Sequence, residues 1–274
     1  MIIANKMAGR VCGEVLGESP AMHWVDILGY RISTDGPEGV TGRALALLDA
    51  SVKGRYIACA NPHSLVVAAH DDQFRAALLH ADILTPDGVG IILAGKILRG
   101  LPRKRVVGYD LFTRFSGAVA RRGPVRYFFL GSSAPVLERI SARMAREYPG
   151  ITVCGTYAPS FAETFSEAEN EKMIAEINAA RPHVLWVGMT APKQEKWIYT
   201  HRHRLEVPLI GAVGAVFDFY AGTKKRAPRW VQASGLEWLF RFVIEPGRLW
   251  SRNLRSAPLF VKMVVLERMS RSRR

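Results

Sequence analysis

Short, continuously apolar runs alternate with segments of helical composition through most of this chain, and this alternation constrains the fold more than any other feature. Apolar runs without polar alternation are typical of strands buried on both faces, as in parallel sheets covered by helices. The pattern therefore predicts an α/β fold: a mostly parallel sheet with helices on both faces. The expected strands are 55–60, 83–85, 126–130, 151–157, 184–187 and 209–213, and the clearest helices are 64–79, 134–146 and 166–180.

The charge is distributed unevenly and suggests three parts. The net charge is +14, and the segment from Phe219 onward holds thirteen Lys and Arg against three acids, which is +10 of that total. Such an excess indicates an anionic partner: a membrane surface, a nucleic acid or a phosphate-rich substrate. We expect a loose N-terminal leader over 1–22, an α/β core over 23–222 and a basic amphipathic helical appendage over 223–274.

Tryptophan, leucine and phenylalanine mix with arginine at helical spacing in the expected appendage. Basic amphipathic helices with interfacial tryptophan are typical of proteins that lie on an anionic leaflet. No apolar run approaches the roughly 18 residues that a spanning helix needs, so the membrane contact is predicted to be peripheral. Two alternatives remain open: a helical subdomain packed on the sheet with its arginine face in solvent, or a subunit interface in a homo-oligomer.

Three cysteines, Cys12, Cys59 and Cys154, lie far apart in the sequence. An odd number at wide spacing argues against a disulfide framework and against a zinc site of clustered ligands, and it fits a reducing cytoplasm. We therefore expect a cytoplasmic protein that lies peripherally on the inner face of the plasma membrane. No Asp-x-Asp pair and no cluster of His, Cys and carboxylates with metal spacing occurs, so neither a metal nor another cofactor is expected.

Two glycine turns follow expected strands and precede helices: Gly131 with Ser132, and Gly188. In an open α/β sheet such turns line the ligand crevice, where helix N-termini favour phosphate; the alternative is that these glycines merely turn the chain. The second turn leads into a helix that begins with Lys193 and Gln194. There, Lys193 and the helix N–H groups are suited to hold a diphosphate, and Gln194 is suited to bond a sugar or acceptor hydroxyl.

Single carboxylates follow two other strands. Asp87 lies between Pro86 and Gly88, a rigid entry and a permissive exit, which suits a general base that takes a proton from an acceptor hydroxyl. Asp218 is suited to accept hydrogen bonds from a ribose or a uracil, and the nearby ring of Tyr220 is suited to stack against that substrate. The alternatives are a turn or capping role for Asp87, and for Asp218 a buried side chain that fixes its own loop.

Taken together, these residues resemble the WecG/TagA/CpsF family of bacterial glycosyltransferases over about residues 25–255. Members of the family make enterobacterial common antigen, wall teichoic acid linkage units and capsular or exopolysaccharides. The resemblance rests on six ordered motifs: Asn61; Thr85-Pro86-Asp87-Gly88; Arg105 with Gly108-Tyr109-Asp110-Leu111; Phe129-Leu130-Gly131; Pro192-Lys193-Gln194-Glu195; and Lys225-Arg226-Ala227-Pro228 with Gly235-Leu236-Glu237-Trp238.

The resemblance implies a single Rossmann-like domain with an inverting, metal-independent site, which a helical C-terminal appendage completes at the membrane. It places the family's catalytic base on Asp87, the pocket asparagine on Asn61 and the glutamine near the substrate sugar on Gln194. The acid that contacts the nucleotide corresponds to Asp218. Substrate contacts are further implied for Thr85 in the motif of the base and, as diphosphate ligands, for Arg105 and for some of Arg241, Arg248 and Arg252.

One position departs from the family pattern: Cys59 stands where many relatives have threonine, two residues before Asn61. A thiol is a poorer hydrogen-bond donor than a hydroxyl. This departure leaves open whether the donor and acceptor preference matches that of the N-acetylmannosamine enzymes.

The sequence thus predicts an inverting glycosyltransferase that moves a hexose or N-acetylhexosamine, of glucose or N-acetylmannosamine type, from a UDP-sugar to a polyprenyl-diphosphate-linked sugar. The product would enter exopolysaccharide, capsule or cell-wall polymer biosynthesis. Two other classes compete with this prediction: a basic nucleic-acid-binding protein and a nicotinamide-dependent oxidoreductase. The interleaving of cations with apolar residues disfavours nucleic acid as a partner, and the absence of a GxGxxG motif after the first strand disfavours the oxidoreductase.

Overall fold

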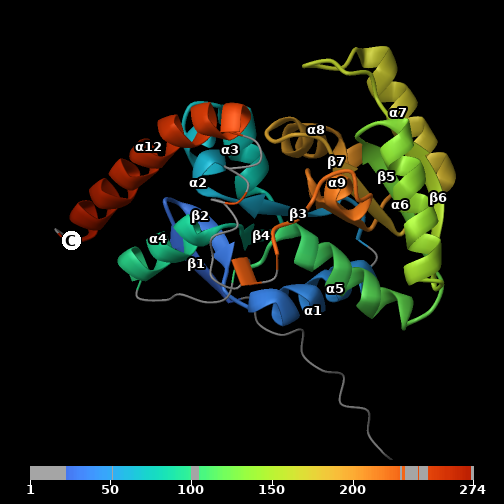
Figure 1. Ribbon diagram of the computed structural model, residues 1–274, viewed down its shortest axis with the longest axis horizontal. Coiled ribbons are helices and arrows are strands. Elements are labelled where there is room, and N and C mark those ends of the chain that lie inside the picture. The colour runs from blue at the N-terminus through green and yellow to red at the C-terminus, as the bar shows by residue number, and fades with distance from the viewer. Residues whose placement is uncertain are drawn as a thin grey trace, which may run out of the picture.

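The computed structural model describes residues 23–50, 52–99, 105–228, 230–231, 240 and 246–272; over 246–254 only the backbone is described. The expected leader over 1–22 lies outside these residues. Within them, a parallel sheet is covered by helices on both faces, and a long helix forms the C-terminal end (Figure 1). The predicted α/β fold is confirmed.

Six strands form the main sheet, in the order β4-β3-β8-β7-β5-β6, and all neighbours are parallel. The carboxyl ends of all six strands therefore lie along one edge. Each predicted strand is confirmed, with ends that differ by at most one residue from those expected. The strands are β3 (Arg55–Ala60), β4 (Ile83–Pro86), β5 (Val125–Gly131), β6 (Ile151–Tyr157), β7 (Val184–Gly188) and β8 (Leu209–Ala212).

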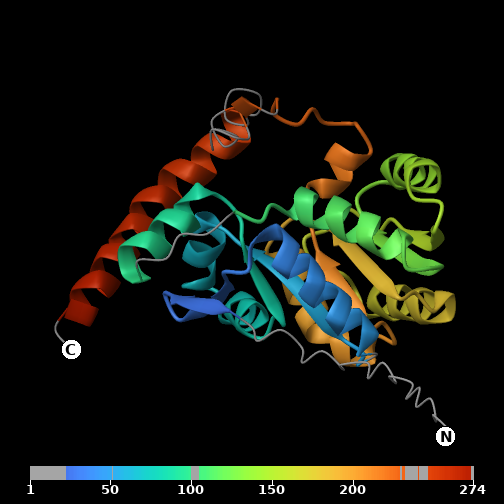
Figure 2. The same cartoon turned by 90° about the horizontal axis from the view of Figure 1, so that it is seen from below.

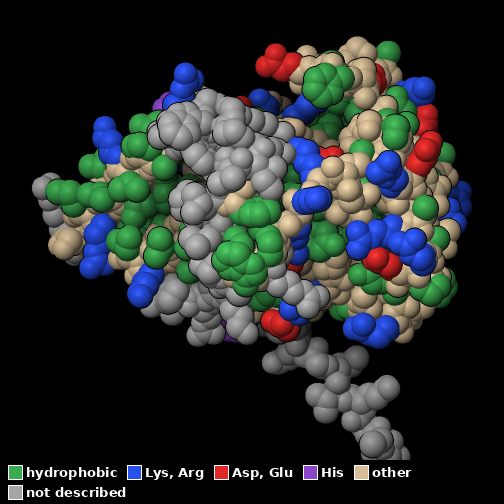
Figure 3. Space-filling view, viewed as in Figure 1, with side chains coloured by type: hydrophobic (Ala, Val, Ile, Leu, Met, Phe, Trp, Pro, Cys, Tyr) green, Lys and Arg blue, Asp and Glu red, His purple; other side chains and the backbone are tan. Residues whose placement is uncertain are grey.

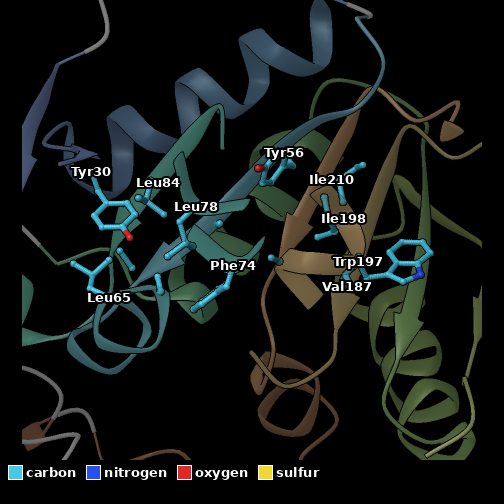
Figure 4. Packing of buried hydrophobic residues seen from close by; sticks show 14 of the residues in the cluster. Tyr30, Tyr56, Leu65, Phe74, Leu78, Leu84, Val187, Trp197, Ile198 and Ile210 are labelled. Carbon is cyan, nitrogen blue, oxygen red and sulfur yellow. The ribbon is translucent and has the colours of Figure 1, made fainter. Parts of the chain in front are cut away.

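Side chains alternate between two cores, one on each face of the sheet. Phe128 and Leu130 enter the first core, whereas Tyr127 and Phe129 enter the second, as the twofold period of a strand requires. The first core, shown in Figure 4, is covered by α2 (Pro62–Ala68), α3 (Asp72–Leu79), α4 (Val89–Arg99), α7 (Glu167–Ala180) and α8 (Lys193–His201). The second is covered by α1 (Gly36–Asp49), α5 (Gly108–Ala120), α6 (Ala134–Glu147) and α9 (Val216–Tyr220).

The structure differs from the sequence prediction in two places near the N-terminal end. A hairpin of β1 (Trp24–Ile27) and β2 (Tyr30–Ser33) precedes α1, where no strands were expected. The single helix expected over 64–79 is two helices, α2 and α3. The second helix begins anew because the side chain of Asp71 accepts the N–H of Phe74 at 2.9 Å, which caps its first turn.

The C-terminal helix α12 (Pro246–Ser272) lies against α2 and α4 (Figure 2), with Phe260 and Val264 buried in the first core. His63 Nδ1 of α2 lies 2.6 Å from Ser256 Oγ of α12. Helix α12 therefore packs on the core, through its contacts with α2 and α4. Among the described helices, none is long and apolar enough to cross a membrane.

Candidate active site

The predicted motifs gather along one edge of the sheet, because each follows the carboxyl end of a parallel strand. This edge contains a topological switch point: β5 continues to β6 on one side, whereas β7 continues to β8 on the other. Ligands of open α/β sheets bind where neighbouring strands diverge in this way. Gly131 and Gly188 are register partners at that point, and a Cβ on Gly131 would lie 2.7 Å from the Gly188 backbone. Ser132, which follows, has a φ of 58°.

Asn61 and Asp87 lie at the ends of the neighbouring strands β3 and β4. Asn61 caps α2: its side chain accepts the N–H of Ser64 at 2.9 Å, and Ser64 Oγ accepts the N–H of Asn61 at 2.8 Å. The N–H of Asp87 donates to the carbonyl of Ala60 at 2.8 Å, which holds the loop after β4 against β3. The expected base therefore stands beside the expected pocket asparagine, with its side chain partly exposed.

Cys59 and Thr85 lie on these same two strands, as register partners. The hydroxyl of Thr85 donates to Cys59 Sγ at 3.2 Å. Burial, and then the carboxylate of Asp87, raise the pKa of the Cys59 thiol to about 12, so the thiol stays protonated at neutral pH. Thr85 is fully buried and supports the thiol from inside the sheet. Because the side chain of Thr85 is buried, it is not exposed to make the predicted substrate contact.

The first turn of α8 buries two polar side chains, Gln194 and Glu195. Gln194 Nε2 donates to Glu195 Oε1 at 2.8 Å, whereas the other two oxygens, Gln194 Oε1 and Glu195 Oε2, have no hydrogen-bond partner in the described part of the chain. Burial raises the pKa of Glu195 to about 7, and the bond from Gln194 opposes this shift. Unsatisfied buried oxygens cost stability, and such groups cluster at functional sites.

Gln194 also contacts the turn after β8. A Cβ on Gly214 would lie 3.5 Å from Gln194 Oε1, and Gly214 itself has a φ of 54°. The turn after β8 therefore lies against the start of α8. Gly108, at the start of α5, is packed against the same turn and against Cys59, since its Cβ would meet the carbonyl of Val213 at 3.7 Å and Cys59 Sγ at 3.8 Å.

Lys193 is turned toward the loop between β6 and α7. Its Nζ donates to the carbonyl of Ala162 and lies 3.6 Å from the centroid of the Phe165 ring. Burial lowers the pKa of Lys193, which the nearby carboxylate of Glu169 opposes. The ammonium group thus ties this loop to the start of α8.

Asp218 and Tyr220, both on α9, take different positions. The Asp218 carboxylate is partly exposed and lies 3.8 Å from Lys224 Nζ. Tyr220 is fully buried: its hydroxyl donates to Glu147 Oε2 at 3.1 Å, and the guanidinium of Arg143 stacks on its ring. The substrate contact predicted for Tyr220 is therefore not open to its side chain, which anchors α9 to α6 instead.

The start of α5 joins two of the sequence motifs. Arg226 donates to Asp110 Oδ1 at 2.9 Å, and its guanidinium lies 4.5 Å from the centroid of the Tyr109 ring. Arg105 leads into this helix, and the N–H of the following Val106 donates to the carbonyl of Pro86 at 3.0 Å. The chain at Arg105 therefore passes directly beside the end of β4, next to Asp87.

The C-terminal arginines are not placed at the site. Arg241 lies outside the described residues, and Arg248 and Arg252 belong to α12 where only the backbone is described. No group of three or more His, Cys, Asp or Glu suited to hold a metal ion occurs in the described ranges.

Comparison with known proteins indicates the family to which the chain belongs. The model of the glycosyl transferase WecG/TagA/CpsF family matches residues 25–274. An N-acetylglucosaminyldiphosphoundecaprenol N-acetyl-beta-D-mannosaminyltransferase of Bacillus spizizenii is 32% identical over 78% of this chain and 79% of its own length. A protein of the same name from Bacillus subtilis is 29% identical over 78% of this chain and 80% of its own length. Another, from Staphylococcus aureus, is 28% identical over 86% of this chain and 90% of its own length.

The fold and these matches together define a glycosyltransferase. The chain belongs to the WecG/TagA/CpsF family, as the resemblance of its motifs predicted. Family membership decides against the two competing classes, the nucleic-acid-binding protein and the nicotinamide-dependent oxidoreductase.

Sequence analysis assigns no role of its own to Glu195, which occurs there only within the motif Pro192-Lys193-Gln194-Glu195. Its position in the first turn of a helix offered no other local signal. The pairing of Asp110 with Arg226 was also not predicted, although both residues belong to motifs that carried the family resemblance.

Proposed function

We propose that this protein transfers a hexose or N-acetylhexosamine, of glucose or N-acetylmannosamine type, from a UDP-sugar to a sugar carried on a polyprenyl diphosphate. The relatives are named for N-acetylmannosamine transfer to an undecaprenol-linked acceptor, which supports a lipid-linked acceptor for this chain. The product would serve exopolysaccharide, capsule or cell-wall polymer biosynthesis at the inner face of the plasma membrane. Because Cys59 departs from the family pattern, the sugar preference need not match that of the relatives. Transfer assays with a panel of UDP-sugars would identify the sugar.

The position of Asp87 is the observation that carries this proposal. Asp87 follows β4 on the sheet edge that contains the switch point, its N–H donates to the carbonyl of Ala60 next to Asn61, and its carboxylate lies within the electrostatic reach of Cys59. Asp87 takes the proton of the acceptor hydroxyl while the hydroxyl oxygen attacks the anomeric carbon of the donor. The bond from that carbon to the UDP oxygen breaks, UDP leaves, and a single displacement inverts the configuration.

The donor would lie across the turns after β5, β7 and β8. Backbone N–H groups near Gly131, Ser132 and Gly188 are suited to the diphosphate, and the partly exposed Asp218 is suited to the nucleoside. Gln194 is buried against the turn after β8, and its Oε1, which has no hydrogen-bond partner in the described part of the chain, is suited to accept a hydrogen bond from a hydroxyl of the transferred sugar. Lys193, Arg105 and the arginines of the C-terminal segment would supply the positive charge that the leaving diphosphate needs.

We further propose that the reaction needs no metal ion, with arginine and lysine in the role that a divalent cation plays in other transferases. Transfer in buffer with excess chelator should equal transfer in buffer with added Mg²⁺. A rate that falls with chelator and returns with the ion contradicts this part of the proposal.

Replacement of Asp87 by Asn tests the assignment of the base. The variant keeps the size of the side chain but cannot take a proton, so kcat should fall by roughly 10²- to 10⁴-fold, while UDP binding measured by calorimetry is retained. Asp72→Asn, on the exposed start of α3, is the matched control and should be unchanged. Near-normal turnover by D87N would refute the assignment.

A further inference from the structure

Helix α4 carries a row of exposed aliphatic side chains. Val89, Leu93 and Ile97 recur every four residues on one face and are 38%, 52% and 50% exposed. The opposite face, with Ile91 and Leu98, is buried in the first core. A helix with one apolar face in the core and a second apolar face in solvent has more apolar surface than its own fold uses.

Helix α12 repeats this arrangement. Its inner face is buried through Phe260 and Val264, and its outer face carries a second row at the same spacing, Val261, Val265 and Met269. Leu259 and Leu266 are exposed on the other flank. Figure 3 shows hydrophobic side chains, with lysine and arginine among them, on the side of the molecule where α12 and α4 lie.

The two rows belong to one surface because the helices are tied together. Arg268, which follows Val265 by three residues and shares its flank of α12, donates to the carbonyl of Ile97 at 2.8 Å. Asp26 of β1 accepts a hydrogen bond from Arg271 of α12 at 2.7 Å and lies 3.8 Å from Arg99 of α4. These contacts hold α4 and α12 side by side, as Figures 1 and 2 both show.

Cations border both rows. Lys96 lies next to Ile97 on α4, and Lys262 lies next to Val261 on α12; both are exposed. Apolar rows with a cationic border are complementary to a bilayer that contains anionic lipid. A second copy of the chain would bring like charges together at the same border, which disfavours it as the occupant.

The surface is continuous with the candidate active site. Val89, the first residue of α4, is only two residues beyond Asp87, a chain distance of roughly 7 Å at most. A bilayer that contacted this row would therefore meet the chain next to Asp87. The sugar and diphosphate of a lipid-linked acceptor lie at that depth, just outside the acyl region.

We propose that α4 of the core and α12 together form the surface that binds an anionic bilayer, and that this contact sets Asp87 at the level of the acceptor head group. The contact is therefore built by the catalytic core as well as by the basic C-terminal segment. This inference rests on the proposed function for its orientation, whereas the lipid contact itself can be measured without turnover.

The full-length chain is tested by co-sedimentation with vesicles of phosphatidylcholine alone and of an equal mixture with phosphatidylglycerol. Wild-type protein should bind the mixed vesicles. Leu93→Glu with Ile97→Glu on α4, and Val261→Glu with Val265→Glu on α12, should each lower the partition coefficient by roughly tenfold or more. Val52→Glu is the matched control: Val52 is 47% exposed but precedes β3, at the opposite edge of the sheet, and its substitution should change nothing.

Three results would overturn the inference. The first is unchanged vesicle binding by the α4 variant while the α12 variant is impaired, which would restrict the contact to the C-terminal helix. The second is binding that does not depend on either helix. The third is a dimer that the α4 variant dissociates without loss of vesicle binding, which would assign the surface to a second copy.

Turnover on a water-soluble, short-chain acceptor keeps this test separate from that of the proposed function. If wild type transfers sugar to that acceptor but the α4 variant keeps its vesicle binding, the proposed bilayer-binding surface is refuted and the proposed enzyme activity is supported. If wild type binds vesicles through both helices but transfers no sugar from any UDP-sugar, the proposed enzyme activity is refuted and the proposed bilayer-binding surface is supported. Melting temperatures close to that of wild type show that the variants are folded.

Discussion

Arg226 and Asp110 are 116 residues apart in sequence, and the guanidinium of Arg226 donates a 2.9 Å hydrogen bond to the carboxylate of Asp110. The same guanidinium stacks on Tyr109. This pair attaches the basic segment that follows α9 to the start of α5, close to the end of β4. It is a partly exposed ion pair, so its contribution is to placement of the segment more than to global stability.

Arg226→Ala should therefore impair catalysis without unfolding the protein. We expect the melting temperature to change little, because partly exposed ion pairs contribute about 1 kcal/mol or less. We expect kcat/KM to fall by roughly tenfold, because the basic segment loses its attachment beside the site. Steady-state kinetics and a thermal melt measure the two effects.

The control for this variant is on α5, the helix that carries Asp110. Arg114→Ala removes a 3.0 Å ion pair with Glu38 in which both side chains are more exposed, and it should leave both quantities unchanged. Equal effects of the two substitutions would show that the Arg226 pair has no special role. The charge-reversed double variant Asp110→Arg with Arg226→Asp should recover part of the lost kcat/KM.

The raised pKa of Glu195 predicts that the stability of the folded protein depends on pH. Its pKa is raised by burial from 4.5 to about 7 in the folded protein, so between these values the folded state binds a proton that the unfolded state does not. Stability contributed by this group is therefore largest below pH 4.5, falls as the pH rises to 7 and stays low above it. The total change is on the order of 3 kcal/mol.

Glu195→Gln removes this titration. Relative to wild type, the variant should gain stability as the pH is raised from 5 to 8, measured as the difference in denaturation midpoint at each pH. Glu138→Gln, at an exposed position on α6, should show no such trend. A difference between E195Q and wild type that is constant over this range would contradict the assignment of a proton to the buried carboxyl.

Gly131 tests the contact between the two turns at the switch point. Its φ is 116°, and a Cβ would lie 2.7 Å from backbone atoms of Gly188, which cannot move without shifting β7. Gly131→Ala should destabilise the protein by roughly 2–5 kcal/mol, the combined cost of backbone strain and overpacking. Urea denaturation measures this change.

Gly123→Ala separates these two causes. Gly123 also has a positive φ, 137°, but its Cβ would meet nothing within 4 Å, so only the backbone strain applies there. We expect a loss of about 1–2 kcal/mol at Gly123. Equal losses at Gly123 and Gly131 would show that the contact with Gly188 adds nothing.

The strands were predictable from sequence because burial on both faces is a local property of each run. The ranges 55–60 and 151–157 match β3 and β6 to the residue. The helix over 134–146 was likewise expected close to its observed end, since it follows an amphipathic pattern. The four-residue strands of the hairpin gave no comparable signal, and the break between α2 and α3 depended on one capping side chain, Asp71.

The candidate site divides in the same way. The sequence by itself determined which residues follow the carboxyl ends of strands, among them Asn61, Asp87 and Gln194, because parallel strands place all such ends at one edge. Only the tertiary structure decided which of those side chains remain available. Thr85 and Tyr220 are buried because neighbouring strands and helices cover them. Glu195 is buried because α8 packs onto the sheet, and its Oε2 has no hydrogen-bond partner among the residues that the structure describes. The position of α12 was also decided by the tertiary structure. An apolar helix with basic residues can pack on a bilayer or on a protein core, so its sequence alone does not place it.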